Sequence, residues 1–349
     1  MEKYITCFIG TYTKGESKGI YKVLIDIQSL KFKEISLAYK IENPTYLALS
    51  DDKKLLYSVM KDSKSSENIK GGIASFSLKT NDYSLRSLNN NISLGAPPCH
   101  IFLDNNKKNI ICSNYHRGTL ELFNLNENGC ISNESSIKNH NIIYNSTSHV
   151  HYSSISNDGN YIFSVDLGLD KLITYRFTDG KIGDLVSVFD FPKGSGPRHM
   201  IFHPNGKFAY IVTELSSEVI VLNYSSSSGS FEFVQAISTL PKDYSGENYP
   251  AAIHIDKLGT YLYVSNRGHD SIGVFSIDSL SYELKLVSHH STLGKGPRDF
   301  SLDPSGEILI AANEHSNNIS CFSIDKNKGS LTPTDDPLRV PSPVCIKFI

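Results

Sequence analysis

A pair of short apolar runs joined by a turn is the recurring unit of this chain. Its clearest copy spans residues 196–214, where 208–212 is aromatic and β-branched, as is typical of a strand. Between the runs, 204–206 (Pro-Asn-Gly) predicts a tight turn, because Asn and Gly tolerate the positive φ of hairpins. We therefore expect an antiparallel hairpin that brings Arg198 and Glu214 to one edge.

The same unit recurs along the chain, at steps of 46 to 54 residues. Its seven copies start at Pro44, Pro98, Val150, Pro197, Pro250, Pro297 and Pro343. Further apolar runs follow the hairpins, such as a third at 172–177 and a fourth at 185–189. Four strands in a period of about 50 residues are the mark of a β-propeller blade. No helical periodicity is sustained.

The seventh copy has only its first strand, 343–349. We expect residues 4–9, 19–25 and 32–39 to supply its other strands, because such a closure removes exposed sheet edges. The sequence thus predicts an all-β, seven-bladed β-propeller of four-stranded antiparallel blades. Its last blade is closed by N- and C-terminal strands, and residues 1–349 form one domain. A pair of β-sandwiches is the alternative, and the shared register argues against it.

Composition narrows the function classes. The 349 residues carry a net charge of −2, so no overall field favours nucleic acid or an anionic membrane. No apolar stretch is long enough for a membrane span or a signal peptide. The six cysteines are scattered and Trp is absent, which favours reduced thiols and excludes WD-type repeats. We expect a cytoplasmic protein, a monomer or weak homodimer, with surface loops at 61–72 and 225–230.

The repeat register brings two series of side chains to one rim of the ring. The first series consists of the residue directly after the first residue of each unit. The second series consists of the residue at the end of each second strand, which is Glu214 in the fourth unit, Lys61 in the first and Tyr115 in the second. First strands line the channel of a propeller, so both series meet at one mouth. The candidates at this mouth, with two neighbouring histidines, are His151, Arg198, Glu214, Arg267, Arg298, Glu314, His100 and His199.

These residue types suit an anionic substrate and the activation of water. Guanidinium groups grip a phosphate or carboxylate in bidentate fashion and stabilise an oxyanion, while a carboxylate or neutral imidazole acts as a base. Alternatives stay open. In one alternative, one of the two pairs Arg198–Glu214 and Arg298–Glu314 is a structural ion pair. In another, His151 is a hydrogen-bonded core residue. The remaining alternatives make His100 and His199 polar lining.

Signals for other chemistry are missing from the sequence. It lacks a nucleophile elbow, a Walker loop, a dinucleotide fingerprint and zinc-type spacing, so we expect neither a metal nor another cofactor. Asp166 and Asp170 are either cation ligands or caps on the backbone amides of a turn.

Several motifs together resemble the seven-bladed propeller lactonase family, that of bacterial propeller-type 6-phosphogluconolactonase and fungal carboxymuconate cyclase. The motifs are 10–13 (Gly-Thr-Tyr-Thr), 18–21 (Lys-Gly-Ile-Tyr), 149–151 (His-Val-His), 166–171 (Asp-Leu-Gly-Leu-Asp-Lys), 196–199 (Gly-Pro-Arg-His) and 343–348 (Pro-Val-Cys-Ile-Lys-Phe). The resemblance covers essentially the whole chain. It implies hydrolysis of a sugar-acid δ-lactone in the cytosol without an obligatory metal.

The resemblance also implies roles for single residues. The His, Arg, Glu and second Arg of the cyclase branch match His151, Arg198, Glu214 and Arg267, which become the expected catalytic set. The expected substrate-binding residues are Arg298, His199, His100 and Glu314. One departure is residues 148–150, Ser-His-Val where the family often has Pro-His-Ala, which alters the chain path before His151.

The most specific expectation is hydrolysis of 6-phospho-D-glucono-1,5-lactone to 6-phosphogluconate, in the pentose phosphate pathway. In this scheme Glu214 or His151 activates water, Arg198 stabilises the oxyanion, and Arg267 and Arg298 hold the phosphate. One alternative is a lactonising or lactone-opening enzyme for a non-phosphorylated carboxylate. Another is a non-catalytic propeller that binds a protein partner.

Overall fold

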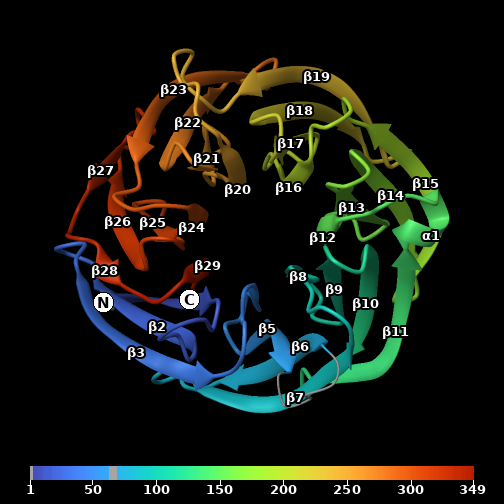
Figure 1. Cartoon of the computed structure of the whole chain (residues 1–349), viewed down its shortest axis with the longest axis horizontal. Coiled ribbons are helices and arrows are strands. Elements are labelled where there is room, and N and C mark those ends of the chain that lie inside the picture. The colour runs from blue at the N-terminus through green and yellow to red at the C-terminus, as the bar shows by residue number, and fades with distance from the viewer. Residues whose placement is uncertain (1–2, 63–68) are drawn as a thin grey trace.

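Antiparallel sheets arranged as blades around a central channel form the whole molecule. The computed structural model describes residues 3–62 and 69–349, and within them the strands make seven such sheets (Figure 1). In each sheet the first strand faces the channel and the last lies at the periphery. The predicted all-β seven-bladed propeller is confirmed.

Three sheets follow one another in the first half of the chain. Their strands are β4 (Leu47–Leu49), β5 (Leu55–Asp62), β6 (Lys70–Leu78) and β7 (Leu85–Leu94); β8 (His100–Leu103), β9 (Asn109–Asn114), β10 (Thr119–Leu125) and β11 (Ile131–Asn139); and β12 (Val150–Ile155), β13 (Tyr161–Asp166), β14 (Lys171–Thr178) and β15 (Lys181–Asp190). A short helix, α1 (His140–Tyr144), follows β11, and the Asn139 side chain caps it by accepting a hydrogen bond from the Ile142 amide.

Three more sheets follow in the second half. Their strands are β16 (Pro197–Phe202), β17 (Phe208–Thr213), β18 (Glu218–Ser225) and β19 (Ser230–Ser238); β20 (Tyr249–Ile255), β21 (Tyr261–Arg267), β22 (Ser271–Ile277) and β23 (Leu284–Ser291); and β24 (Pro297–Leu302), β25 (Ile308–Asn313), β26 (Asn318–Ile324) and β27 (Leu331–Pro333). The short β28 (Leu338–Arg339) also pairs with β26.

The seventh sheet takes strands from both ends of the chain, as predicted. Its order is β29 (Pro343–Phe348), β1 (Tyr4–Thr11), β2 (Gly19–Asp26) and β3 (Phe32–Lys40). Ile346 of β29 lies opposite Ile9 of β1, and the two chain ends lie close together in Figure 1. The ring is therefore closed by backbone hydrogen bonds between the first and last strands.

Some predicted boundaries are wrong. β4 and β8 begin at Leu47 and His100, after Pro44 and Pro98, whereas β16, β24 and β29 begin at the prolines that start their units. The predicted loop 61–72 is wrong at both ends, since β5 runs through Asp62 and β6 starts at Lys70. Residues 63–68 lie outside the described residues. The turn predicted at 225–230 does join two outer strands, β18 and β19.

The core lies between neighbouring sheets rather than inside one layer. Phe163 of β13 and Ile211 of β17, for example, belong to one buried cluster shared by adjacent blades. Second strands such as β9 and β25 are buried along their entire length, because both faces of each blade are covered. Within the described residues, no helix has the length and apolar character needed to span a membrane.

Candidate active site

The candidates on the innermost strands sit in β-bulges. The pairing of β12 with β13 passes over His151, that of β16 with β17 passes over Arg198, and that of β24 with β25 passes over Arg298. A bulge inserts an unpaired residue and changes the direction of its side chain. All three residues consequently line the same cavity at one mouth of the channel.

The loops before two of these bulges are held by aspartates. Asp170 accepts hydrogen bonds from the Gly194 and Gly196 amides, both at 2.7 Å, and Gly196 has a φ of 61°. Two sheets further on, Asp270 accepts from the Gly296 amide at 2.8 Å. For Asp170 the capping alternative is therefore the one observed. It fixes the backbone two residues before Arg198.

Asp166 also holds backbone amides. Its Oδ1 accepts from the amides of His149 at 2.9 Å, Gly168 at 3.2 Å and Leu169 at 3.1 Å. Its Oδ2 lies 2.8 Å from the Nδ1 of the buried His140. The carboxylate anchors the segment before His151, whose sequence departs from the family pattern.

Glu214 is held between two arginines. Its Oε2 lies 2.8 Å from Nε of Arg198 and 3.0 Å from a terminal nitrogen of Arg267. Neither N–H points squarely at the oxygen, so both contacts are ion pairs with poor hydrogen-bond alignment. Residues from β16, from the end of β17 and from β21 thus meet at one point, as the register predicts.

Both arginines are also fixed from behind. Arg198 is buried and donates to the Ala251 carbonyl at 2.6 Å and to Nε2 of His199 at 3.2 Å. Arg267 donates from Nε to the Tyr249 carbonyl at 2.8 Å. The bond from Arg198 makes Nε2 of His199 an acceptor, so the proton of its neutral ring is on Nδ1.

The second Arg–Glu pair is looser. Arg298 lies 4.0 Å from Glu314, whose other oxygen is only 2.9 Å from Nζ of Lys14. The Arg298 guanidinium instead sits over the ring of Tyr12, 5.6 Å from its centroid. Of the three arginines on the cavity wall, Arg298 has the weakest carboxylate contact.

Electrostatics keep Glu214 ionised. Burial raises the pKa of Glu214, but three arginines outweigh burial and hold it below its usual value. They are Arg198, Arg267 and Arg298. Burial, followed by the charge of Arg267, lowers the pKa of Arg198 to about 10, so the guanidinium is protonated at neutral pH.

Burial has the opposite consequence for the histidines. It lowers the pKa of His151 well below its usual range, and Arg198 and Arg298 lower it further. Burial is also the largest cause of the lowered pKa values of His100 and His199. His151 is therefore a neutral imidazole at neutral pH, and its Nδ1 has no hydrogen-bond partner among the described residues.

The cavity at this mouth has a volume of about 690 Å³. Its wall includes six of the predicted residues, His151, Arg198, His199, Glu214, Arg267 and Arg298. Glu314 and His100 are not on this wall. Four residues for which the sequence predicted no role also line it: Tyr12, Asn43, Lys61 and Tyr115. The register of second-strand ends does mark Lys61 and Tyr115.

Aromatic rings close the channel below the cavity. His100 lies 4.4 Å from the ring of Tyr46, 4.6 Å from Tyr152 and 5.6 Å from His199, between ring centroids. A second cavity of about 650 Å³ opens on the opposite side and shares Tyr46 and His199 with the first. His100 thus belongs to the plug and to the far cavity, behind the predicted site.

Among the described residues, no group of three or more His, Cys, Asp or Glu side chains is arranged to hold a metal ion. The chemistry that these residues can perform themselves is that of a neutral imidazole, an ionised carboxylate and three guanidinium groups around one cavity. Such a set binds an anion, activates water and stabilises an oxyanion.

Comparisons with known proteins agree with this geometry. The family model "Lactonase, 7-bladed beta-propeller" matches residues 6–348. A Bacillus subtilis protein named 6-phosphogluconolactonase is 39% identical over 353 residues, covering 100% of this chain and 99% of that protein.

Solved structures give the same result. A Lactobacillus plantarum protein aligns with a TM-score of 0.92 at 32% identity, over 99% of both chains. A periplasmic gluconolactonase of Pseudomonas aeruginosa aligns with a TM-score of 0.88 at 26% identity, also over 99% of both chains. The resemblance noted in the sequence is confirmed: the chain belongs to the seven-bladed β-propeller lactonase family and is a lactone hydrolase.

Proposed function

We propose that the protein hydrolyses 6-phospho-D-glucono-1,5-lactone to 6-phosphogluconate. The observation that carries this proposal is the cationic wall of the cavity, where Arg298 faces the cavity with only a weak carboxylate contact of 4.0 Å. An available guanidinium suits a phosphate better than a neutral sugar. The name of the Bacillus subtilis relative points to the same substrate.

In this mechanism the lactone carbonyl lies against Arg198 and a water molecule lies against His151. The imidazole takes one proton as the water oxygen bonds to the carbonyl carbon, and Arg198 stabilises the oxyanion that forms. The carbonyl then re-forms as the bond to the ring oxygen breaks, and the imidazolium returns the proton to that oxygen. The products are a carboxylic acid, which ionises, and a free hydroxyl group.

The structure favours His151 over Glu214 as the base. Oε2 of Glu214 is engaged by two guanidinium groups, and its lowered pKa makes the carboxylate a weak proton acceptor. The imidazole of His151 is neutral, lies on the cavity wall and forms no ion pair with a carboxylate among the described residues. Glu214 then positions Arg198 and Arg267.

Two roles expected from the sequence change in this proposal. Arg267 becomes an orienting residue, because it is bound to Glu214 and to the Tyr249 carbonyl. Glu314 and His100, expected to touch substrate, become supports behind the wall, since neither lines the cavity. Arg298 and His199 keep their proposed contacts with substrate.

The deciding experiment is the ring opening of two lactones by purified protein, with and without a chelator. We expect 6-phosphogluconolactone to be opened with a kcat/KM at least about tenfold above that of unphosphorylated gluconolactone, which is worth about 1.4 kcal/mol of selective binding. Equal rates for both lactones would contradict the phosphorylated substrate while leaving lactone hydrolysis intact.

A second candidate substrate is a non-phosphorylated sugar lactone or carboxylate. The observation in its favour is the fold likeness to the Pseudomonas aeruginosa gluconolactonase at 26% identity. In that case Arg298 would contact a carboxylate or a sugar hydroxyl, and the same experiment distinguishes the two. The non-catalytic alternative is set aside, because the family is one of lactone hydrolases.

Four further expectations belong to this proposal. The reaction would serve the pentose phosphate pathway and occur in the cytoplasm, where sugar phosphates are formed. The protein would act as a monomer or weak homodimer. The chain would fold as a single domain over residues 1–349, which the shared closing sheet supports.

A further inference from the structure

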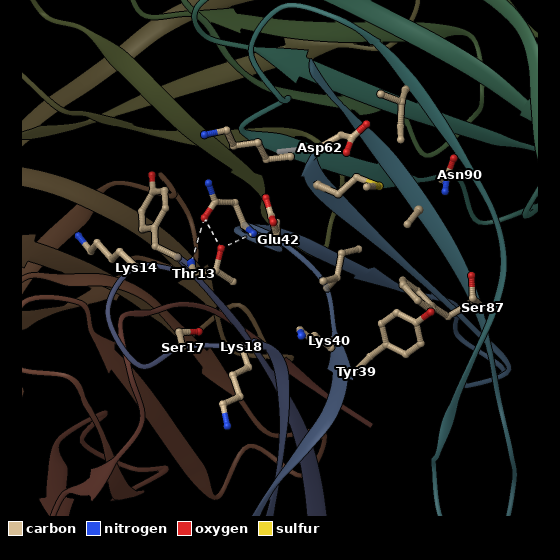
Figure 2. Close-up of a pocket in the computed structure, with 18 residues that line it drawn as sticks. Thr13, Lys14, Ser17, Lys18, Tyr39, Lys40, Glu42, Asp62, Ser87 and Asn90 are labelled. Carbon is tan, nitrogen blue, oxygen red and sulfur yellow. Dashed lines mark hydrogen bonds between the residues drawn. The ribbon is translucent and has the colours of Figure 1, made fainter. Parts of the chain in front are cut away.

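A third cavity lies next to the active-site cavity. It has a volume of about 1000 Å³ and lies between the closing sheet and the β4–β7 sheet (Figure 2). Its wall is made by the β1–β2 loop, the end of β3 and the segment after it, the end of β5, and parts of β6 and β7. Tyr12, Asn43 and Lys61 line both cavities, so these three residues form the boundary between them.

The junction between the cavities is a fixed structure. Asn43 Oδ1 accepts hydrogen bonds from the Thr13 amide at 2.9 Å and from the Thr13 hydroxyl at 3.0 Å. The same hydroxyl accepts from the Asn43 amide at 3.1 Å, as the dashed lines in Figure 2 show. This reciprocal clamp holds the β1–β2 loop against the segment that follows β3.

Lys61 is the cation at this junction. It occupies in the first blade the register position that Glu214 occupies in the fourth, so its side chain belongs to the same mouth. The residue is half-buried, and its ammonium group pairs with no carboxylate in the described part of the chain. Lys14 differs, because it is bound to Glu314.

The ring places Lys61 across the mouth from the proposed chemistry. The β4–β7 sheet lies on the opposite side of the ring from the β16–β19 sheet that carries Arg198 (Figure 1). Lys61 and Arg198 therefore line the active-site cavity from opposite sides of the ring (Figure 1). Arg298 reaches the same region, because it stacks on Tyr12, which also lines both cavities.

We propose that Lys61 is the phosphate-recognition residue of the enzyme and that the junction of the two cavities is its phosphomonoester subsite. This inference rests on the proposed function, because it assumes that the lactone carbonyl lies against Arg198. The ammonium group donates to the phosphate oxygens, and Arg298 contributes from the neighbouring wall. The groove beyond the junction leaves the doubly charged group in contact with water.

The test uses variants of the full chain. Lys61→Met removes the charge and keeps the apolar stem, and Lys61→Arg keeps the charge. Lys40→Met is the matched control, because Lys40 is exposed and lines the groove without lining the active-site cavity. The measured quantity is the ratio of kcat/KM for 6-phosphogluconolactone to kcat/KM for gluconolactone.

We expect Lys61→Met to lower this selectivity ratio by about 10- to 100-fold, the size of a lost hydrogen bond to a charged group. Lys61→Arg should retain most of the ratio, and Lys40→Met all of it. A ratio that is unchanged in Lys61→Met overturns the subsite. An equal drop in Lys40→Met also overturns it, since the effect would then be a general loss of positive field.

A binding measurement separates this inference from the proposed function. Calorimetry with 6-phosphogluconate as the probe needs no turnover, and Lys61→Met should weaken its binding by at least about tenfold. If the wild-type protein opens neither lactone but binds the probe through Lys61, the proposed function fails and the subsite stands. If both lactones are opened and Lys61→Met binds the probe as wild type does, the subsite alone fails.

Discussion

Each charged side chain at the mouth has its chemical state set by its neighbours. Glu214 shares one oxygen between two guanidinium groups, which makes it a counter-ion, whereas His151 is neutral and has an unpartnered nitrogen. The same cluster that lowers the pKa of His151 also lowers that of Glu214. The positive charge of the arginines therefore keeps Glu214 ionised, as a counter-ion, and keeps His151 neutral, as the proposed base.

The base assignment predicts a pH profile. A histidine whose pKa is below its usual 6.5 is neutral above that value and becomes protonated as the pH falls through the lowered pKa. In wild-type protein kcat/KM should be level above about pH 7 until the pH approaches 10, where Arg198 loses its proton, and on the acidic side it should fall only below pH 6.5. Substituting His151→Asn should lower kcat by about 10²- to 10⁴-fold and remove this acidic limb.

Glu214→Gln is the comparison for that experiment. It leaves buried Arg198 without its counter-ion, so we expect a loss of about 2 kcal/mol in the free energy of unfolding, less than for a fully buried pair because Glu214 is partly exposed. The acidic limb should persist in this variant. If Glu214→Gln abolishes the limb and His151→Asn keeps it, the two roles are reversed.

At the scale of the element, the bulges and the loops before them direct the side chains. Asp170 and Asp270 hold equivalent loops, and each loop ends at an arginine bulge. Glu214 and Glu314 follow equivalent strands and bond through their amides to Gly196 and Gly296. The repeated backbone explains why two Arg–Glu pairs occur in one ring.

Asp170→Ala tests this positioning. Removing the acceptor leaves the Gly194 and Gly196 amides unbound, and we expect Arg198 to lose its fixed position. The variant should lose about 1 kcal/mol in the free energy of unfolding but about tenfold or more in kcat, with a smaller change in KM.

Asp278→Ala is the control for that measurement. Asp278 accepts from the Leu280 and Ser281 amides at 2.9 and 2.8 Å, in an exposed turn between the outer strands β22 and β23. Asp278→Ala should lower the free energy of unfolding by an amount similar to that of Asp170→Ala, but it should not change kcat. Equal effects on kcat in the two variants would show that Asp170 contributes only to folding.

Much of this arrangement was predictable from the sequence, because a repeat places equivalent residues at equivalent points of a ring. Arg198 and Glu214, or Glu214 and Arg267, were predicted to meet on register alone, and they do. Register cannot show that Lys14, which is distant in sequence, lies closer to the Glu314 carboxylate than Arg298 does. That contact depends on the path of the β1–β2 loop across the ring.

The aromatic plug was unpredictable for a related reason. His100 has the same position relative to Pro98 as His199 has relative to Pro197, so the register predicted that both lie near the mouth. Burial depth depends on how the rings of Tyr46 and Tyr152 pack across the channel, and those residues come from different blades. Only the assembled ring shows that His100 lies beneath the cavity.

At the scale of the whole molecule, the closing sheet keeps the mouth together. β29 contributes four buried residues, Pro343, Val344, Cys345 and Ile346. Its neighbour β1 leads into the loop that carries Tyr12 and Lys14. Ring closure and the wall of the active-site cavity therefore depend on the same few strands.

Deleting residues 343–349 should abolish cooperative folding. Burying each large apolar side chain is worth about 1.5–3 kcal/mol, so losing β29 removes a large part of a typical net stability of about 5–15 kcal/mol. It also exposes the edge of β1 to pairing with other chains. We expect the truncated chain to aggregate or to show no thermal transition by circular dichroism.

A circular permutant distinguishes ring closure from simple loss of sequence. A short linker from Ile349 to Lys3 joins ends that already lie together, since the Ile349 amide donates to the Thr6 carbonyl at 2.9 Å. New ends at 227, in the turn between β18 and β19, leave all seven sheets intact. We expect this permutant to unfold cooperatively within a few degrees of wild type and to retain lactone turnover. If the truncated chain instead unfolds like wild type, hydrogen bonding between β29 and β1 is not what closes the ring.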